Sequence, residues 1–185
     1  MSASSSSSCE GYHKKTGRAV LDFAADLLKQ LETTPLSLFI LESAWAFPTI
    51  ESLHVIAIAF VVGTISVVDF RLLGVASTKR GFTEVCREVL PWTWLAFTVA
   101  ALAGLLLFIS HATDYFGNTA FRLKMLVMLM AGANMVYFHV VTCRNLSEWD
   151  HDSVIPTGGR IAGGISLACW IAIVGLGRWI GFSMS

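Results

Sequence analysis

The stretch IESLHVIAIAFVVGTISVVDFRLL, residues 50–73, is a long and almost uninterrupted apolar run. A helix that crosses the roughly 30 Å hydrocarbon core of a bilayer needs about 20 mostly apolar residues, and this stretch has that length and composition. Three further stretches of the same kind follow at residues 92–112, 120–142 and 161–182. The sequence therefore predicts four membrane-spanning helices.

The composition of the 185 residues also favours a membrane protein. Hydrophobic residues make up 55% of the chain and charged residues 14%, which is too apolar for most soluble domains of this length. A soluble bundle of such helices would need a covering shell of amphipathic segments, and the chain does not supply one. We therefore expect an all-α, polytopic membrane protein, a four-helix transmembrane bundle in contact with the lipid bilayer.

The chain ahead of the first span divides into two regions. Residues 1–18 hold a serine run and polar residues, so they are expected to be a disordered tail. Residues 19–48 predict short amphipathic, interfacial helices, because apolar residues recur at helical spacing and Thr34-Pro35 separates two segments. Residues 49–185 are the predicted transmembrane domain.

The cations near the span ends predict the orientation of the bundle. Most of them lie in the first and third connections: Arg71, Lys79, Arg80, Arg87, Arg144 and Arg160. Because such loops stay on the cytoplasmic side, the N- and C-termini would face the periplasmic side of a bacterial inner membrane. The formal net charge is zero and the four cysteines are scattered, so we expect neither a nucleic acid partner nor a disulfide.

An outer layer of polar side chains lies inside or at the edge of the spans, where each costs a few kcal/mol unless it finds a partner. Two neutral imidazoles from facing helices can ligate a heme iron, and nearby cations can neutralise the propionates. His54 and His111 are the candidate axial ligands, and Arg122, Lys124 and Arg178 are the candidate propionate partners. In the alternative interpretation, His54 is satisfied by a carbonyl or by Glu51, and His111 is an exposed interfacial residue.

Small residues on the second span predict room for a planar group. Ala96, Ala100 and Gly104 leave a thin strip along one face of this span, and small residues let neighbouring groups approach a helix closely. Gly104 lies two turns before His111. A tetrapyrrole beside this strip is compatible with the histidine pair.

An inner layer contains Asp69, Arg71, Asn134 and His139. Asp69 could accept a hydrogen bond from His139 and fix the tautomer of its ring, which would make His139 the competing axial ligand if the heme lies across this leaflet. Alternatively, Asp69, Arg71 and His139 pair with one another or with lipid headgroups. For Asn134 we expect a hydrogen bond between two spans.

Three segments carry a resemblance to known families: SLHVIAIAFVVGTISVVDFRLLGVA, PWTWLAFTVAALAGLLLF and NTAFRLKMLVMLMAGANMVYFH. Together they resemble an uncharacterised family of bacterial four-span membrane proteins over roughly residues 48–144. More distantly, they look like HemJ-type protoporphyrinogen oxidases and copper-resistance D membrane modules. That resemblance implies a heme-associated role for His54 and a functional role for Lys124. The aspartate at Asp69 departs from the HemJ pattern, so porphyrinogen oxidation is not implied.

These observations predict a membrane protein that binds b-type heme and passes electrons to or from a quinone or a partner subunit. The first alternative is a copper or small-solute transport or resistance protein, with Met128, Met135 and the histidines as transient copper ligands. The second is a cofactor-free assembly subunit of an oligomer or larger membrane complex. No catalytic residue is assigned by these patterns, so they leave enzymatic activity open.

Overall fold

The computed structural model describes residues 22–76, 81–138, 140 and 155–183. Within these ranges every regular element is a helix. Four of them are long and apolar enough to cross a membrane: α3 (Ala46–Leu72), α4 (Phe82–Ser110), α6 (Thr119–Tyr137) and α8 (Thr157–Ser183). The protein is a four-helix transmembrane bundle, so the fold class that the apolar stretches predict is confirmed.

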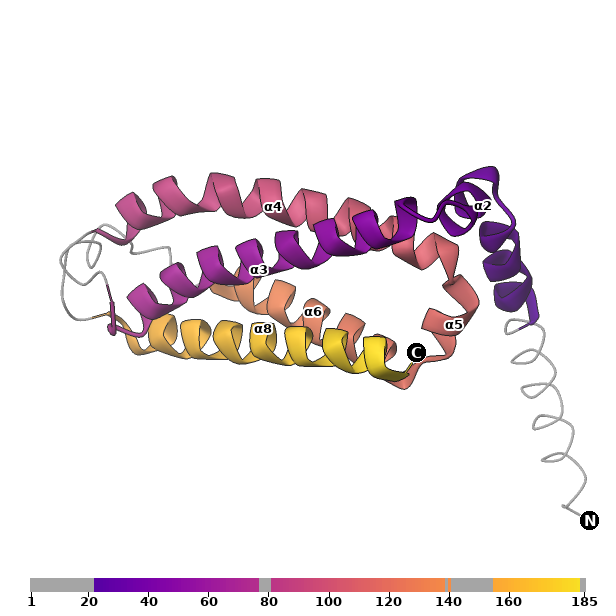
Figure 1. Cartoon of the computed structure of the whole chain (residues 1–185). Coiled ribbons are helices and arrows are strands. Elements are labelled where there is room, and N and C mark those ends of the chain that lie inside the picture. The colour runs from indigo at the N-terminus through magenta and orange to yellow at the C-terminus, as the bar shows by residue number, and fades with distance from the viewer. Residues whose placement is uncertain (1–21, 77–80, 139, 141–154, 184–185) are drawn as a thin grey trace, which may run out of the picture.

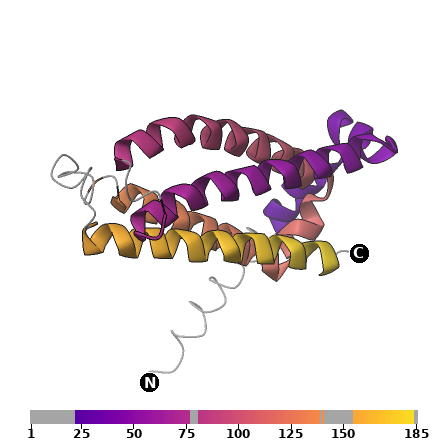
Figure 2. The same ribbon diagram turned by 60° about the vertical axis from the view of Figure 1, so that its left-hand side comes forward.

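The four long helices pack as two pairs that meet along one seam (Figures 1 and 2). Helix α3 runs beside α4, α6 runs beside α8, and α3 also contacts α8. Among the described residues, α6 has no extensive contact with α3 or α4, and none of its side chains is fully buried. A half-buried stripe on α6 that includes Lys124, Met128, Ala131 and Asn134 marks its packed side.

Short helices gather at the end of the bundle where α4 passes into α5 (Ala112–Gly117), here called the α5 end (Figure 1). They are the helix at residues 22–32 and α2 (Pro35–Glu42). The hydroxyl of Thr34 accepts the N–H of Ser37 and so caps α2, with Pro35 in the first turn, as expected from the Thr34-Pro35 pair. Ser37 is fully buried, and its hydroxyl donates to the carbonyl of Ile109 at 3.4 Å. Helix α2 is thereby attached to α4.

Several helices extend beyond the predicted spans. Helix α4 begins at Phe82 and continues through Pro91, although a proline next to an apolar run reads as a helix start. Proline cannot donate to the carbonyl four residues before it, but membrane helices tolerate this loss. Helices α3 and α8 also begin a turn before the apolar runs, because a helix can continue outside the hydrocarbon core.

Glu32 attaches the first of the short helices to α5. Its Oε1 accepts the backbone N–H of Thr113 at 2.8 Å, and this bond is the main reason that the pKa of Glu32 lies below its ordinary value of 4.5. Because the pKa of Glu32 is lower in the folded protein than in the unfolded chain, its ionised carboxylate stabilises the attachment. This stabilisation is complete at pH values above the unfolded pKa. That stabilisation is lost as the pH falls through the folded pKa.

We therefore expect residues 22–42 to lose protection from amide hydrogen exchange as the pH falls below 4.5, the ordinary pKa of a glutamate. The measurement is hydrogen exchange followed by mass spectrometry, corrected for the intrinsic pH dependence of exchange. Glu32→Gln keeps an acceptor oxygen and should remove the pH dependence of the protection, whereas Glu32→Ala should lower the protection by about 1 kcal/mol at neutral pH, where the wild-type bond is intact. An unchanged pH profile in Glu32→Gln would contradict the assignment.

Candidate functional site

His54 lies on α3 about two turns from its start, and its ring packs against α4. Its Nδ1 is 2.8 Å from the carbonyl oxygen of Ala100. Because a carbonyl can only accept, Nδ1 carries the proton and donates, and Nε2 of the neutral ring keeps a lone pair. Among the described residues Nε2 has no hydrogen-bond partner, and it is not among the fully buried polar atoms. Metal-ligating histidines are oriented in this way.

Gly104 makes the approach of this ring to α4 possible. A Cβ at position 104 would lie 2.8 Å from Cε1 of His54 and 3.3 Å from Nδ1. Ala100 and Ala96, on the same face, are buried. The small-residue strip predicted on this helix therefore exists, and at Gly104 the space over it is filled by the His54 ring.

Lys124 places a cation on the packed side of α6. Its Nζ lies 3.6 Å from the position that a Cβ on Gly177 of α8 would take, and its charge is within electrostatic range of the His54 ring. No carboxylate and no hydrogen-bond acceptor of the described chain pairs with this ammonium. A lone cation inside a span is costly, so an anionic group is the partner that this position suits.

The other two predicted propionate partners lie on the exposed surface of the α5 end. The Arg122 guanidinium donates to the hydroxyl of Thr119 at 3.3 Å. The Arg178 guanidinium lies over the ring of Phe182, 5.4 Å from its centroid. Of the three predicted cations, Lys124 alone is turned towards the packed side of its helix.

His111 ends α4 and precedes α5. Its ring stands edge-on to Phe47, with the centroids 5.4 Å apart. The His54 ring contacts α4 at Gly104, which is two turns earlier and about 10 Å away along the helix axis. The structure therefore places His54 and His111 at different levels of the bundle instead of bringing their rings together.

An aromatic cluster lies beside His111 at the α5 end. Phe108 stacks on Phe121 with their centroids 5.6 Å apart, and Tyr115 contacts both rings. Burial raises the pKa of Tyr115, and the negative charge of Glu51 adds to the effect. These rings join α4, α5 and the start of α6, the helix that carries Lys124.

The inner layer is partly described. Asp69 and Arg71 are buried, with 3% and 0% of their surfaces exposed. The Asn134 amide donates to the carbonyl of Ala162 on α8 at 2.9 Å, which is the bond between spans that the sequence predicts. His139 lies outside the described residues, and so does the predicted pair of His139 with Asp69.

The methionines of α6 differ in their exposure. Met128 is half-buried on the packed stripe with Lys124, whereas Met135 exposes 46% of its surface. In the part of the chain that the structure describes, no cluster of three or more His, Cys, Asp or Glu side chains could hold a metal ion. A copper site built from these methionines and the histidines therefore has no supporting group of ligands there.

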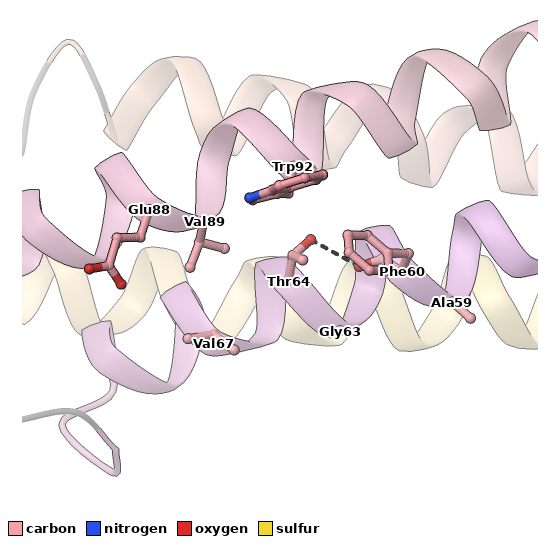
Figure 3. Close-up of a pocket in the computed structure, with 8 residues that line it drawn as sticks. All are labelled: Ala59, Phe60, Gly63, Thr64, Val67, Glu88, Val89 and Trp92. Atoms are coloured by element: carbon pink, nitrogen blue, oxygen red, sulfur yellow. Dashed lines mark hydrogen bonds between the residues drawn. The ribbon is translucent and has the colours of Figure 1, made fainter.

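A groove of about 740 Å³ opens between α3 and α4, away from His54 (Figure 3). It is lined by Ala59, Phe60, Gly63, Thr64, Val67, Glu88, Val89 and Trp92. Its lining is mostly apolar, and the Thr64 hydroxyl already donates to the Phe60 carbonyl at 2.9 Å. No pattern in the sequence predicts this groove, because its residues have the composition of any lipid-facing helix surface.

Comparison with known proteins gives one family. Residues 44–183, which include all four long helices, match a family of unknown function, DUF6644. No curated protein and no solved structure matches the sequence. The match agrees with the resemblance to an uncharacterised four-span family and extends it through the fourth span, and nothing in it points to a HemJ-type relation. The chain belongs to the DUF6644 family.

Proposed function

We propose that this protein binds a b-type heme near the α5 end and acts as an electron-transfer component of a bacterial inner membrane. The observation that supports this most is the state of His54. Its Nδ1–H is held by the Ala100 carbonyl at 2.8 Å, and its Nε2 keeps an accessible lone pair. A neutral imidazole oriented by a carbonyl suits a heme iron. The heme would supply a one-electron carrier.

Lys124 supports an anionic cofactor in the same region. Its ammonium lies on the packed side of α6, near His54, without a carboxylate partner in the described chain. A heme propionate would supply that charge. In the described part of the chain, α6 has no extensive contact with α3 or α4 apart from the aromatic rings near its start, so a planar group that enters between them would separate few packed residues.

The redox partner in this proposal is a quinone in the bilayer or a partner subunit.

The positions of the cations around the helix ends favour an orientation with the α5 end on the periplasmic side. In this orientation His54 and Lys124 lie in the outer half of the bilayer.

The absorbance spectrum of the purified full chain tests the proposal. Protein expressed with a supply of heme precursor should show a Soret band that shifts on reduction with dithionite. His54→Ala should abolish the band, and Lys124→Gln should lower the heme content. Arg122→Gln is the matched control, because Arg122 is exposed and bonded to its own helix, and it should leave the heme content unchanged.

The His111→Ala variant tests whether His111 would also help to hold the heme. Loss of a second strong ligand would change the spectrum from low-spin to high-spin while the heme is retained. A colourless wild-type protein would overturn the heme proposal, and so would a full Soret band in His54→Ala. If the colourless protein retains copper through gel filtration, the transport alternative gains. If it retains no metal, the assembly role gains.

A further inference from the structure

Asp69 is a carboxyl group buried within the bundle, about one turn before the end of α3. Only 3% of its surface is exposed. In the described part of the chain its Oδ2 has no hydrogen-bond partner, although this atom is shielded from the surroundings. Buried carboxyl groups are normally paired or fully hydrogen-bonded, so this one needs an explanation.

The burial of Asp69 follows from the close approach of α3 and α8. A Cβ on Gly163 of α8 would lie 2.9 Å from Cβ of Leu72 and 3.2 Å from the backbone oxygen of Asp69. The two backbones therefore meet where α8 has no side chain. The hydroxyl of Ser166, about one turn further along α8, lies beside the Asp69 carboxyl.

A cluster of apolar side chains lies beside this seam. Leu72 belongs to a core cluster with Phe82, Phe138, Ile155 and Ala162, and Val68 packs against it. These side chains join α3 to the helices around it at the end opposite α5. The surroundings of Asp69 therefore exclude water from most of the carboxyl group.

No charge in the described residues compensates an ionised Asp69. The ionisable residues on nearby stretches of α3, α4 and α8 are Arg71, Glu84, Cys86, Arg87, Glu88, Arg160 and Cys169. The Ser166 hydroxyl lies beside the carboxyl, and no ion pair between Asp69 and any of these residues occurs in the described part of the chain. A carboxylate ion without a cation in such a place is far more costly than a neutral acid.

We propose that Asp69 is a proton-binding site of the membrane domain. The side chain is held as a neutral carboxylic acid at neutral pH, and it exchanges its proton with water through the nearby end of α3. Uptake converts the carboxylate and one proton into the acid, and release reverses this step, so no other reactant is needed. The site is separate from the proposed heme site, because about 22 Å of helix lies between His54 and Asp69.

Infrared spectroscopy of the purified full chain tests this site. At neutral pH the spectrum of wild type minus Asp69→Asn should contain the carbonyl stretch of a protonated carboxylic acid, and this band should move to lower frequency in D₂O. Asp114→Asn is the matched control, because Asp114 is an exposed aspartate on α5. The spectrum of wild type minus Asp114→Asn should contain carboxylate bands only.

A second measurement guards against a variant that fails to fold. Asparagine has the shape and neutrality of the protonated acid, so Asp69→Asn should keep the wild-type thermal midpoint at neutral pH. Asp69→Glu should retain an acid band at an altered frequency. The proposal is overturned if the difference spectrum of wild type minus Asp69→Asn shows carboxylate bands at neutral pH, whether or not the buffer contains sodium ions. It is also overturned if the acid band does not move after prolonged incubation in D₂O.

Discussion

Alanine in place of Gly163 is expected to destabilise the bundle by about 1–3 kcal/mol, the usual cost of overpacking a well-packed core. The new Cβ would lie 2.9 Å from the Leu72 Cβ and 3.2 Å from the Asp69 backbone oxygen. Neither atom can move without its helix, so α3 and α8 must separate. The gain of up to about 1 kcal/mol from the helix propensity of alanine offsets only part of this cost. Reversible unfolding in mixed micelles measures the difference.

Gly175→Ala is the matched control for this prediction, because Gly175 lies on the same helix and its Cβ would meet nothing within 4 Å. It should leave the stability unchanged or raise it slightly. Equal losses in the two variants would mean that glycine itself is needed along α8, for a reason other than the contact with α3. An unchanged stability in Gly163→Ala would show that the two helices are less closely packed than described.

Gly104→Ala is expected to displace the His54 ring from the Ala100 carbonyl while leaving the helices in place. The clash is with Cε1 at 2.8 Å, and a histidine ring can rotate away from it. In the proposed heme protein this removes the group that orients the ligand, and loss of such a hydrogen bond typically costs about ten- to a hundredfold in metal affinity. Heme titration of the apoprotein gives the affinity, and circular dichroism confirms that helix content is retained.

A double variant separates the geometry from the cofactor. Gly104→Ala alone should lower the stability of the apoprotein, because the ring must leave its site. In the His54→Ala background the same change should cost nothing, because no ring remains to clash, and the gain in helix propensity remains. Additive effects of the two substitutions would contradict the contact between the ring and Gly104.

Features that depend on solvent and on local chain geometry could be predicted from the sequence. The four spans follow from length and apolarity, because lipid selects for both. Thr34-Pro35 marks the start of α2 because capping depends on adjacent residues. The bond of Asn134 to α8 follows from the cost of a lone amide in hydrocarbon.

Features that depend on how the helices pack against one another could not be predicted. Depth in the membrane puts Arg122, Lys124 and Arg178 in one layer, but depth does not say which side of a helix a side chain occupies. Only the packing of α6 on α8 turns Lys124 inward. The seam that buries Asp69 depends likewise on Gly163, which carries no local signal because many span glycines make no such contact.

The contacts of α6 also bear on how the protein can assemble while it is being made. A chain is completed from its N-terminus, so the hairpin of α3 and α4 can form before the later helices exist. Helix α6 ends at Tyr137, and the helix on which it packs starts at Thr157. Until α8 has entered the bilayer, α6 lacks its main packing partner and meets the earlier helices at the aromatic rings near its start. Insertion of α8 therefore gives a packing partner to α6 and to α3 at once.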